Sequence, residues 1–309
     1  MLIISEKNIE VLKNGCVATV GFFDGVHAGH RFLIEELKTI AKRKNLPAVV
    51  VTFSIHPRKV LHSDYQPLLL NTLDEKIEQL SKVGVDACVV LDFSVEMAQL
   101  SAYDFMKRVL IEKYNVHSLL IGHDHRFGHN RTEGYKDYVR YGELLGMEMV
   151  EATRFYLSNS FHVSSSEVRN ALKRGDLGLS KILLGYNYSL KGKVIDGFKM
   201  GRKIGFPTAN IQPENDDKLV PSAGVYAVEV KLDSTTFRGM MNIGVRPTIG
   251  NGSERSIEVH IFDFNREIYN SSIEIEFLRK IREERKFANV DELVVQLKKD
   301  KKQILSTLI

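Results

Sequence analysis

Apolar runs alternate with amphipathic stretches along the first 184 residues of the chain. The apolar runs have the length of buried β-strands, and the stretches between them carry apolar side chains at helical spacing. The expected strands are Val17–Phe22, Ala48–Phe53, Ala87–Leu91, Ser118–Ile121 and Glu148–Glu151, and the expected helices are Arg31–Arg43, Leu73–Lys82, Ala102–Tyr114 and Tyr135–Leu145. This alternation predicts a parallel sheet covered on both faces, which binds ligands at the carboxyl ends of its strands.

From about Tyr186 the pattern changes to short β-rich segments punctuated by Gly and Pro. In the last of these segments, isoleucine and phenylalanine alternate with glutamate, as in a strand with one solvent-exposed face. The expected strands are Ser189–Ile195, Val225–Leu232, Phe237–Ile243, Ile257–Phe262 and Ile273–Leu278, and a charged helix follows from about Val290. The pattern predicts an antiparallel β-barrel with a C-terminal helix, and a domain boundary between residues 184 and 185.

Composition limits the class of protein only broadly. The chain has 309 residues, enough for two domains, with ordinary hydrophobic and charged shares of 43% and 27%. The net charge of +4 fits a small anionic ligand as well as nucleic acid. Cys16 and Cys88 lie in apolar runs, which predicts buried free thiols in a reducing compartment. With no signal-like N-terminus and no apolar run near 18 residues, we expect a cytoplasmic protein that spans no membrane.

The segment GFFDGVHAGH, residues 21–30, joins an expected strand to an expected helix. His27 and His30 stand at the helix entrance, where unpaired backbone N–H groups and the helix dipole favour anions. Gly25 and Gly29 let the backbone approach a ligand closely. The segment predicts a nucleotide phosphate site, in which the two histidines offset charge on a leaving pyrophosphate. The alternative is a helix-capping turn with solvated histidines.

Two further segments fit the same site. GHDHRFGHNR, residues 122–131, again follows an expected strand; its arginines can reach phosphates, and Asp124 can accept a hydrogen bond from a ring or ribose. Its histidines also invite a metal interpretation, which a Phe-Gly pair disfavours because it breaks any helical register. VSSSEVR, residues 163–169, has the pattern of a capped helix start, and its hydroxyls and Arg169 can reach a triphosphate. Asp24 is either part of the phosphate site or a turn residue that bonds its own backbone.

A glycine-flanked basic loop, GRKIGFPTAN, occupies residues 201–210. Gly201 and Gly205 permit backbone amides to face phosphates, and the Thr208 hydroxyl can ligate Mg²⁺ beside a nucleotide. An ordinary hairpin loop ending in a rigid turn fits the same residues equally well. The chain contains no GxxxxGK[ST] phosphate loop.

Taken together, these segments resemble the bacterial bifunctional riboflavin kinase/FMN adenylyltransferase family, also called FAD synthetase. The family pattern GxFDGxHxGH is matched in full, as is FPTAN, and Gly224–Val228, Asn242–Thr248 and Glu258–Phe264 follow in the family's order. The second segment carries His125 where phenylalanine is usual. The third has valine, serine and valine at 163, 166 and 168 in place of isoleucine, threonine and isoleucine.

The resemblance implies an α/β plus β fold: a Rossmann-like parallel-sheet nucleotidyltransferase domain at residues 1–184, and a six-stranded antiparallel β-barrel riboflavin kinase domain with a terminal helix at residues 185–309. It implies that the barrel converts riboflavin and ATP to FMN, and that the sheet domain converts FMN and ATP to FAD and pyrophosphate. Riboflavin, FMN, FAD and ATP are then the partners, with Mg²⁺ as the cation, and neither nucleic acid nor membrane is expected. The sequence leaves the oligomeric state unknown.

Residue roles follow from the same resemblance. Glu258 is the base for the ribityl 5′-hydroxyl, with Asp263 as its rival, and the wall Thr52–Arg58 borders the adenylyl-transfer pocket. The segment Arg279–Lys286 with Phe287 resembles one that closes over the flavin, although as a bare pattern it is a solvated connector. The implied site residues are, for catalysis, His27, His30 and Glu258; for nucleotide phosphates, Gly21, Phe23, Asp24, Gly25, Gly29, Ser164, Ser165, Arg169, Gly201, Arg202, Gly205 and Asn210; for flavin, Asp124, Arg126, Phe127 and Arg285; and for the metal ion, Thr208 and Asn210.

Other functions remain open at this point. One alternative is a chain in which only one of the two activities is live, and the His125 departure makes weakened adenylyl transfer conceivable. Another HxGH nucleotidyltransferase, acting on a pantetheine or nicotinamide nucleotide, shares the first motif but not the FPTAN barrel. A non-enzymatic flavin-sensing or RNA-binding protein is a third alternative, disfavoured because no basic-aromatic stripe is present.

Overall fold

The computed structural model describes residues 1–5, 7–61, 68–123, 125–157, 163–197, 200–247 and 253–307. The chain forms two compact units, Met1–Ser165 and Ser166–Ile309. The expected boundary between residues 184 and 185 falls inside the second unit and stays a prediction. No helix in the described ranges has the length and apolarity needed to cross a membrane.

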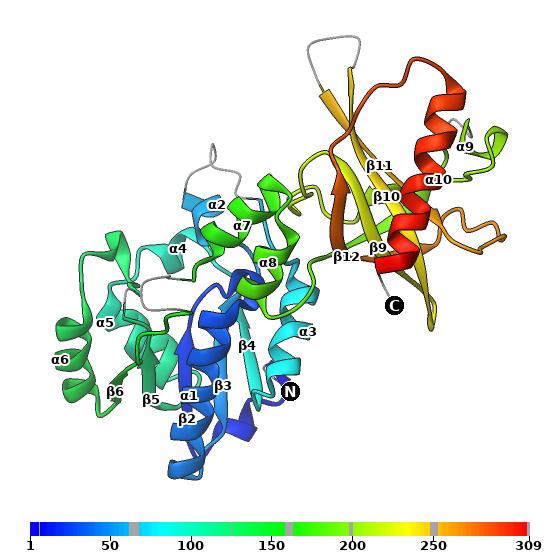
Figure 1. The fold of residues 1–309 in the computed structure, drawn as a ribbon. Helices are drawn as coiled ribbons and strands as arrows, with labels where there is room; N and C mark the ends of the chain where they lie inside the picture. The colour runs from blue at the N-terminus through cyan, green and yellow to red at the C-terminus, as the bar shows by residue number, and fades with distance from the viewer. Residues whose placement is uncertain are drawn as a thin grey trace. The chain divides into compact units, whose positions relative to one another are not determined.

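The first unit contains a six-stranded parallel sheet with strand order β1-β4-β3-β2-β5-β6 (Figure 1). Its strands are β1 (Leu2–Ile4), β2 (Cys16–Val20), β3 (Ala48–Phe53), β4 (Ala87–Leu91), β5 (Val116–Ile121) and β6 (Glu148–Glu151). The chain moves outward from β2 through β3 to β4, then restarts on the other side of β2 with β5. This reversal makes a topological switch point, where α/β sheets bind ligands.

Helices cover both faces of this sheet, as predicted. Alternate residues of β3 enter opposite cores: Val49 and Val51 pack in one, Ala48 and Val50 in the other. The main helices are α1 (Ala28–Lys44), α2 (Pro57–Leu61), α3 (Leu73–Val83), α4 (Val95–Ala98), α5 (Ala102–Asp104) and α6 (Tyr135–Leu145), with one-turn helices η1 (Ile9–Leu12), η2 (Asp24–Val26) and η4 (His129–Arg131). The helix expected from Ala102 begins as α5 and continues as a π-helix, η3 (Phe105–Ile111).

Both cysteines are buried free thiols, as the apolar runs predicted. Burial raises the pKa of Cys16 and of Cys88 to about 12, and in the case of Cys88 the nearby Lys76 opposes the shift. Both thiols are therefore protonated at neutral pH and act as small core residues rather than nucleophiles.

The second unit is built on a closed antiparallel barrel with strand order β10-β11-β8-β7-β12-β9 (Figure 1). Its elements are α7 (Ser165–Arg174), α8 (Leu177–Leu184), β7 (Ser189–Ile195), α9 (Met200–Lys203), β8 (Ala209–Pro213), β9 (Gly224–Leu232), β10 (Thr235–Pro247), β11 (Ser253–Ile261), β12 (Ser272–Arg282) and α10 (Val290–Thr307). The alternation predicted for the last strand is confirmed, because Ile273, Ile275 and Phe277 are all buried in the barrel. The rigid turn expected at the end of FPTAN is wrong: Ala209 and Asn210 begin β8, which pairs with β7 and β11.

Helix α10 packs on the outside of the barrel. Ile304 joins a core cluster with Phe206, Met240 and Phe262. Beside this apolar contact, the Arg282 guanidinium of β12 pairs with Asp300 of α10 at 2.9 Å, and Asp300 is only 1% exposed. Removing one partner of such a buried pair leaves an uncompensated charge, so this ion pair fixes the angle at which α10 docks.

Candidate active sites

The turn after β2 holds an unusual backbone conformation. Phe23, Gly25 and Val26 all have positive φ, at 55°, 81° and 37°. This left-handed region suits glycine and is costly for a β-branched residue such as Val26. The strain keeps the start of α1 directly at the carboxyl end of the strand, and backbone strain of this kind clusters at functional sites.

The two histidines of the motif lie ring against ring at the start of α1. His27 is the N-cap: its Nδ1 accepts the hydrogen bond of the His30 backbone N–H at 3.3 Å. The rings stack with centroids 3.6 Å apart. Burial lowers the pKa of His30 well below its usual value, and His27, His125 and Lys76 lower it further. His30 is therefore neutral at pH 7, and its buried Nδ1 has no hydrogen-bond partner in the part of the chain that the structure describes.

Asp24 fastens the same turn to distant segments. Its carboxylate accepts hydrogen bonds from the backbone N–H groups of Leu70, at 3.0 and 3.2 Å, and Asn71, at 3.2 Å. Its backbone carbonyl accepts the Ser165 hydroxyl at 2.9 Å. Asp24 thus joins the turn to the entrance of α3 and to Ser165, the last residue of the first unit, rather than bonding only its own backbone.

Lys76, on α3, is a site residue that the sequence did not reveal. It is 2% exposed, and its Nζ donates to the carbonyls of Phe22 at 3.1 Å and Phe53 at 2.8 Å. The ammonium also lies 4.1 Å from the Phe22 ring centroid. Burial lowers the pKa of Lys76 to about 8, while the charge of Asp24 opposes that shift. Lys76 therefore holds the segment that follows β2 against the end of β3.

The expected pocket wall, Thr52–Arg58, extends from this same strand end. The Thr52 hydroxyl donates to the Phe22 carbonyl at 3.1 Å, and the His56 ring meets the Phe22 ring edge-on at 4.5 Å. The wall therefore contacts Phe22 of the histidine loop, as we call residues 21–30. The role of the wall toward a ligand stays a prediction.

The loop after β5 is held by an aromatic stack. The Phe127 ring stacks on Tyr138 of α6 with centroids 4.3 Å apart, and the Phe127 N–H donates to the Tyr138 hydroxyl at 3.0 Å. Arg126 is exposed, and its carbonyl accepts the Arg131 Nε–H at 3.0 Å. Phe127 is thus an anchor of the loop, whose contact with flavin stays a prediction. Asp124 lies outside the described residues.

His125 is embedded in this loop. Its Nε2 is buried without a hydrogen-bond partner among the described residues. Burial, aided by the charge of Arg131, lowers the pKa of His125 to about 4. A neutral imidazole therefore stands here at pH 7, close enough to His30 to affect its charge.

Four further residues are expected at this site: Gly21, Gly29 and Ser164 in the first unit, and Arg169 in the second, whose place at the site stays a prediction. The backbone positions Gly21 and Gly29 flank the turn after β2: a side chain at Gly21 would collide with the Phe23 ring, and one at Gly29 would approach the His27 ring. Ser164 is half-buried, and Arg169 lies on α7, one turn beyond Ser165.

In the barrel, the FPTAN residues meet Glu258. The Thr208 hydroxyl donates to Glu258 Oε2 at 3.2 Å. Asn210 of β8 is the cross-strand partner of Glu258, and Asn242 of β10 is its partner on the other side. One row across β8, β11 and β10 therefore presents a carboxylate and two amides, and Thr208, just before β8, adds a hydroxyl.

The loop that leads into FPTAN is closed on itself. The Phe206 N–H donates to the Gly201 carbonyl at 2.9 Å, and a side chain at Gly201 would collide with the Phe206 carbonyl. Gly205 has φ +80°. The Pro207 carbonyl lies 2.8 Å from His260 Nδ1, which holds the loop on β11. Arg202 reaches Glu267 and Tyr269 at 3.4 Å each, and its contact with a nucleotide stays a prediction.

Two other residues singled out from the sequence, Arg285 and Asp263, also belong to the second unit. The Arg285 guanidinium donates to Gln296 of α10 at 2.6 Å and lies 4.7 Å from the Phe287 ring centroid. Asp263, the rival base, follows β11 with φ 52° and reaches Lys301 at 3.7 Å with its side chain 88% exposed. That geometry is typical of a turn residue and favours Glu258 as the base.

Comparison with known proteins now relates both sites to one function. A family model described as FAD synthetase matches residues 9–167, and one described as riboflavin kinase matches residues 184–308. The curated bifunctional riboflavin kinase/FMN adenylyltransferase of Haemophilus influenzae is 40% identical over 97% of this chain and 96% of its own length. The chain belongs to this family. The corresponding Bacillus subtilis protein is 38% identical over 94% of this chain and 91% of its own length.

The chain is therefore a bifunctional enzyme of flavin biosynthesis that makes FMN from riboflavin and ATP, and FAD from FMN and ATP. The riboflavin kinase match excludes an HxGH enzyme that has only the first domain. A solved structure titled as a macrolide-efflux protein from Streptococcus pneumoniae has a TM-score of 0.86 and 32% identity, and the match covers 98% of each chain. The two chains therefore share the same fold.

Proposed function

We propose that each reaction is carried by its own set of residues: adenylyl transfer by the turn after β2 with His27 and His30, and phosphoryl transfer by Glu258 with Thr208 and Asn210. The observation that carries the second assignment is the 3.2 Å hydrogen bond between Thr208 and Glu258, which joins the expected base to the expected ion ligand. Cytoplasmic location is part of this proposal, since both thiols are unpaired.

In the kinase reaction, Glu258 accepts the proton of the ribityl 5′-hydroxyl and orients its oxygen for in-line attack on the γ-phosphate of ATP. Phosphoryl transfer depends on positioning and charge neutralisation, so a carboxylate fixed on a barrel strand is well suited to this task. Release of Thr208 from Glu258 frees the carboxylate for the incoming hydroxyl.

The donor set around Glu258 fits Mg²⁺. A threonine hydroxyl, an asparagine carbonyl and a carboxylate are hard oxygen ligands, which this ion prefers, together with phosphate oxygens. Thr208 and Asn210 would hold the ion. When bound, it neutralises charge on the phosphates of ATP.

In the adenylyl-transfer reaction, the flavin phosphate of FMN attacks the α-phosphate of ATP and pyrophosphate leaves. His27 and His30 stand at a helix N-terminus, where they donate hydrogen bonds to phosphate oxygens and stabilise the developing charge. Because His27 Nδ1 caps the helix, Nε2 is the His27 atom assigned to this contact.

The test is incubation with riboflavin, ATP and Mg²⁺, followed by chromatography of the flavins. We expect His30→Ala to accumulate FMN without FAD, and Glu258→Ala to make FAD only when FMN is supplied. Each variant serves as the folding control for the other site. Full kinase activity in Glu258→Ala would show that the base is a different residue.

A further inference from the structure

The loop after β5 begins beside the histidine loop, at one edge of the parallel sheet. Strands β2 and β5 are parallel neighbours, with Thr19 beside Leu120, so both strands end at the same edge. The His125 backbone N–H donates to the Gly122 carbonyl at 2.9 Å, which closes a turn directly after β5. His125 is therefore held over the end of β5, next to the strand that leads into the histidine loop.

The His125 ring has a fixed aromatic neighbour on its own loop. The centroids of the His125 and Phe127 rings are 6.2 Å apart, and Phe127 is itself stacked on Tyr138 of α6 at 4.3 Å. The Phe127 N–H also donates to the Tyr138 hydroxyl at 3.0 Å. The imidazole is thus positioned by a segment that is anchored to a helix of the same unit.

One nitrogen of this ring lacks a hydrogen-bond partner. His125 Nε2 is buried, and neither it nor the buried Nδ1 of His30 has a partner in the described part of the chain. Burying a polar atom without a partner is costly, so such an atom in a folded protein marks a place where a ligand, an ion or water completes the hydrogen bond. Two such atoms on neighbouring loops indicate one shared ligand.

The charges around the two imidazoles favour an anion as that ligand. Arg131 lowers the pKa of His125, and His27, His125 and Lys76 lower the pKa of His30, so each of these side chains acts on the rings as a cation. Among the described residues, no three His, Cys, Asp or Glu side chains are arranged to hold a metal ion. A phosphate group is the anion that FMN and ATP both carry.

We propose that His125 Nε2 donates a hydrogen bond to a phosphate oxygen of FMN or ATP during adenylyl transfer, which adds a third imidazole to His27 and His30. The inference rests on the proposed function, in which the histidine loop binds phosphate. Phenylalanine, which is usual in the family at this position, has no such donor. The role places the proton of the neutral His125 ring on Nε2.

The chemical step itself leaves this proton in place. An oxygen of the FMN phosphate attacks the α-phosphorus of ATP, the bond from that phosphorus to the bridging oxygen breaks, and pyrophosphate leaves with the bonding electrons. His125 contributes a donor whose direction is set by the loop before the substrates arrive. A donor that is held in place in this way improves the alignment of the reacting phosphates.

Two substitutions separate a hydrogen bond from a packing contact. His125→Phe keeps an aromatic ring without an N–H group, whereas His125→Gln keeps an N–H donor without the ring. We expect His125→Phe to raise the KM for FMN or for ATP in FAD formation about tenfold, with a smaller change in kcat, and His125→Gln to recover part of this loss. Varying each substrate while the other is saturating identifies which phosphate is bound.

The matched control is His117→Phe, the same substitution on the same strand. His117 is exposed and lies near the amino end of β5. It is four residues from Ile121, or about 13 Å along the strand from the edge at which the sheet meets its ligands. Both KM values of this variant should therefore be those of the parent.

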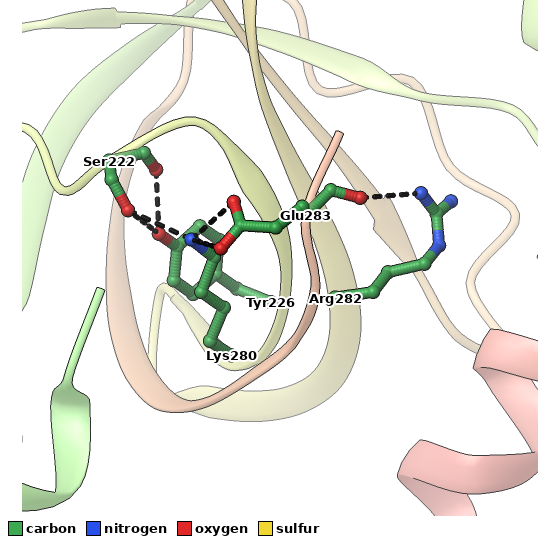
Figure 2. A network of polar contacts seen from close by, with 5 residues as sticks. All are labelled: Ser222, Tyr226, Lys280, Arg282 and Glu283. Atoms are coloured by element: carbon green, nitrogen blue, oxygen red, sulfur yellow. Dashed lines mark hydrogen bonds and ion pairs between the residues drawn. The ribbon is translucent and has the colours of Figure 1, made fainter. Parts of the chain in front are cut away.

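Riboflavin phosphorylation is the internal reference for folding, because the barrel is held by contacts of its own. Figure 2 shows one such network, in which the Lys280 ammonium donates to the Glu283 carboxylate at 2.7 and 2.8 Å and to the Ser222 hydroxyl at 3.0 Å. The Tyr226 hydroxyl donates to the Ser222 carbonyl at 2.6 Å. All four residues belong to the second unit, so the kinase rate of each His125 variant should stay within about twofold of the parent.

Unchanged KM values for both FMN and ATP in His125→Phe would overturn the proposal. A His125→Gln variant that is weaker than His125→Phe would also overturn it, because a ring that only packs against the loop gives that order. Failure of the proposed function is a separate result, since it appears as FAD formation that persists in His30→Ala. The two failures are therefore distinguishable.

Discussion

The two sites of this enzyme use opposite physical environments. At the end of β2, Asp24, Lys76 and His27 are buried, and their polar atoms are matched to backbone groups of neighbouring segments. At the barrel, Thr208 lies exposed beside Glu258. Burial fixes the geometry of the first site, whereas strand register fixes that of the second. The two sites should therefore respond differently to substitution and to pH.

The largest expected effect comes from Lys76→Met. This substitution removes the hydrogen bonds that the Lys76 ammonium donates to the Phe22 and Phe53 carbonyls beneath the histidine loop. We expect FAD formation from FMN to fall about a hundredfold, because the imidazoles lose their alignment with the phosphates. Riboflavin phosphorylation should stay within about twofold of the parent, because no barrel residue changes. Steady-state kinetics of both reactions measure this contrast.

The control for Lys76→Met is Lys82→Met on the same helix. The Lys82 side chain is 55% exposed and pairs with Glu78, so both activities should be preserved. A loss of kinase activity in Lys76→Met would contradict the idea that each site is held by its own unit.

Thr208→Val tests the barrel in the reverse direction. The variant keeps the side-chain shape but removes the hydroxyl that reaches Glu258. We expect riboflavin kinase activity to fall about ten- to a hundredfold, with a higher Mg²⁺ requirement, because an oxygen ligand is lost. FAD formation from supplied FMN should not change. Thr236→Val, at an exposed position of β10, should leave both reactions intact; an undiminished kinase in Thr208→Val would remove Thr208 from the site.

The pH dependence of stability should separate the two units. Because the folded pKa of His125 is about 4, below its usual value of about 6.5, protonation favours the unfolded state. Above pH 6.5 the imidazole is neutral in the folded and the unfolded state, so it does not change the free energy of unfolding. As the pH falls from 6.5 toward 4, it lowers the free energy of unfolding of the first unit, by at most about 2 kcal/mol at pH 5. Amide hydrogen exchange of β2 and β3 reports on this unit alone.

His125→Phe should flatten that acid-side loss, since the ring is kept without a titrating nitrogen. The barrel strands provide the internal reference, and their exchange between pH 5 and 7 should be the same in both proteins. An unaltered pH profile for β2 and β3 would place the origin of acid sensitivity elsewhere, with His30 as the next group to change.

The smallest expected effect is that of Asp263→Asn. Asp263 lies in an exposed turn, where its carboxylate pairs with Lys301, so the kinase should retain its rate within about twofold. A hundredfold loss would reverse the choice between Glu258 and Asp263 as the base.

The hydrophobic pattern alone located the strands that form the body of each unit. Ala48–Phe53, Ala87–Leu91, Glu148–Glu151 and Ser189–Ile195 were predicted with the bounds that the structure has, because each is a local run bounded by turn residues or helices. The short polar strand β8 was missed. Its residues have no strand pattern of their own, and pairing with β7 and β11 makes them a strand.

The motifs likewise predicted which loops carry the chemistry, and the family match confirmed the two reactions. Hydrogen bonding in the fold then separated the roles within those loops. Asp24 and Phe127 appear in the motifs as candidate ligand contacts, yet each is tied to distant parts of its unit. Sequence spacing cannot reveal such partners, because the fold brings them together from other elements, 46 residues away for Asp24 and 11 for Phe127.

By itself, the sequence determined most of the strands and helices in their succession along the chain, the motif-bearing loops and the family. Only the tertiary structure decided that Lys76 is buried beneath the histidine loop and that His125 Nε2 is buried beside it. Lysine and histidine are ordinary residues of solvent-exposed segments, so nothing in their local pattern distinguishes them. Their positions arise from strand order, which brings backbone carbonyls to Lys76 and the end of β5 to the histidine loop.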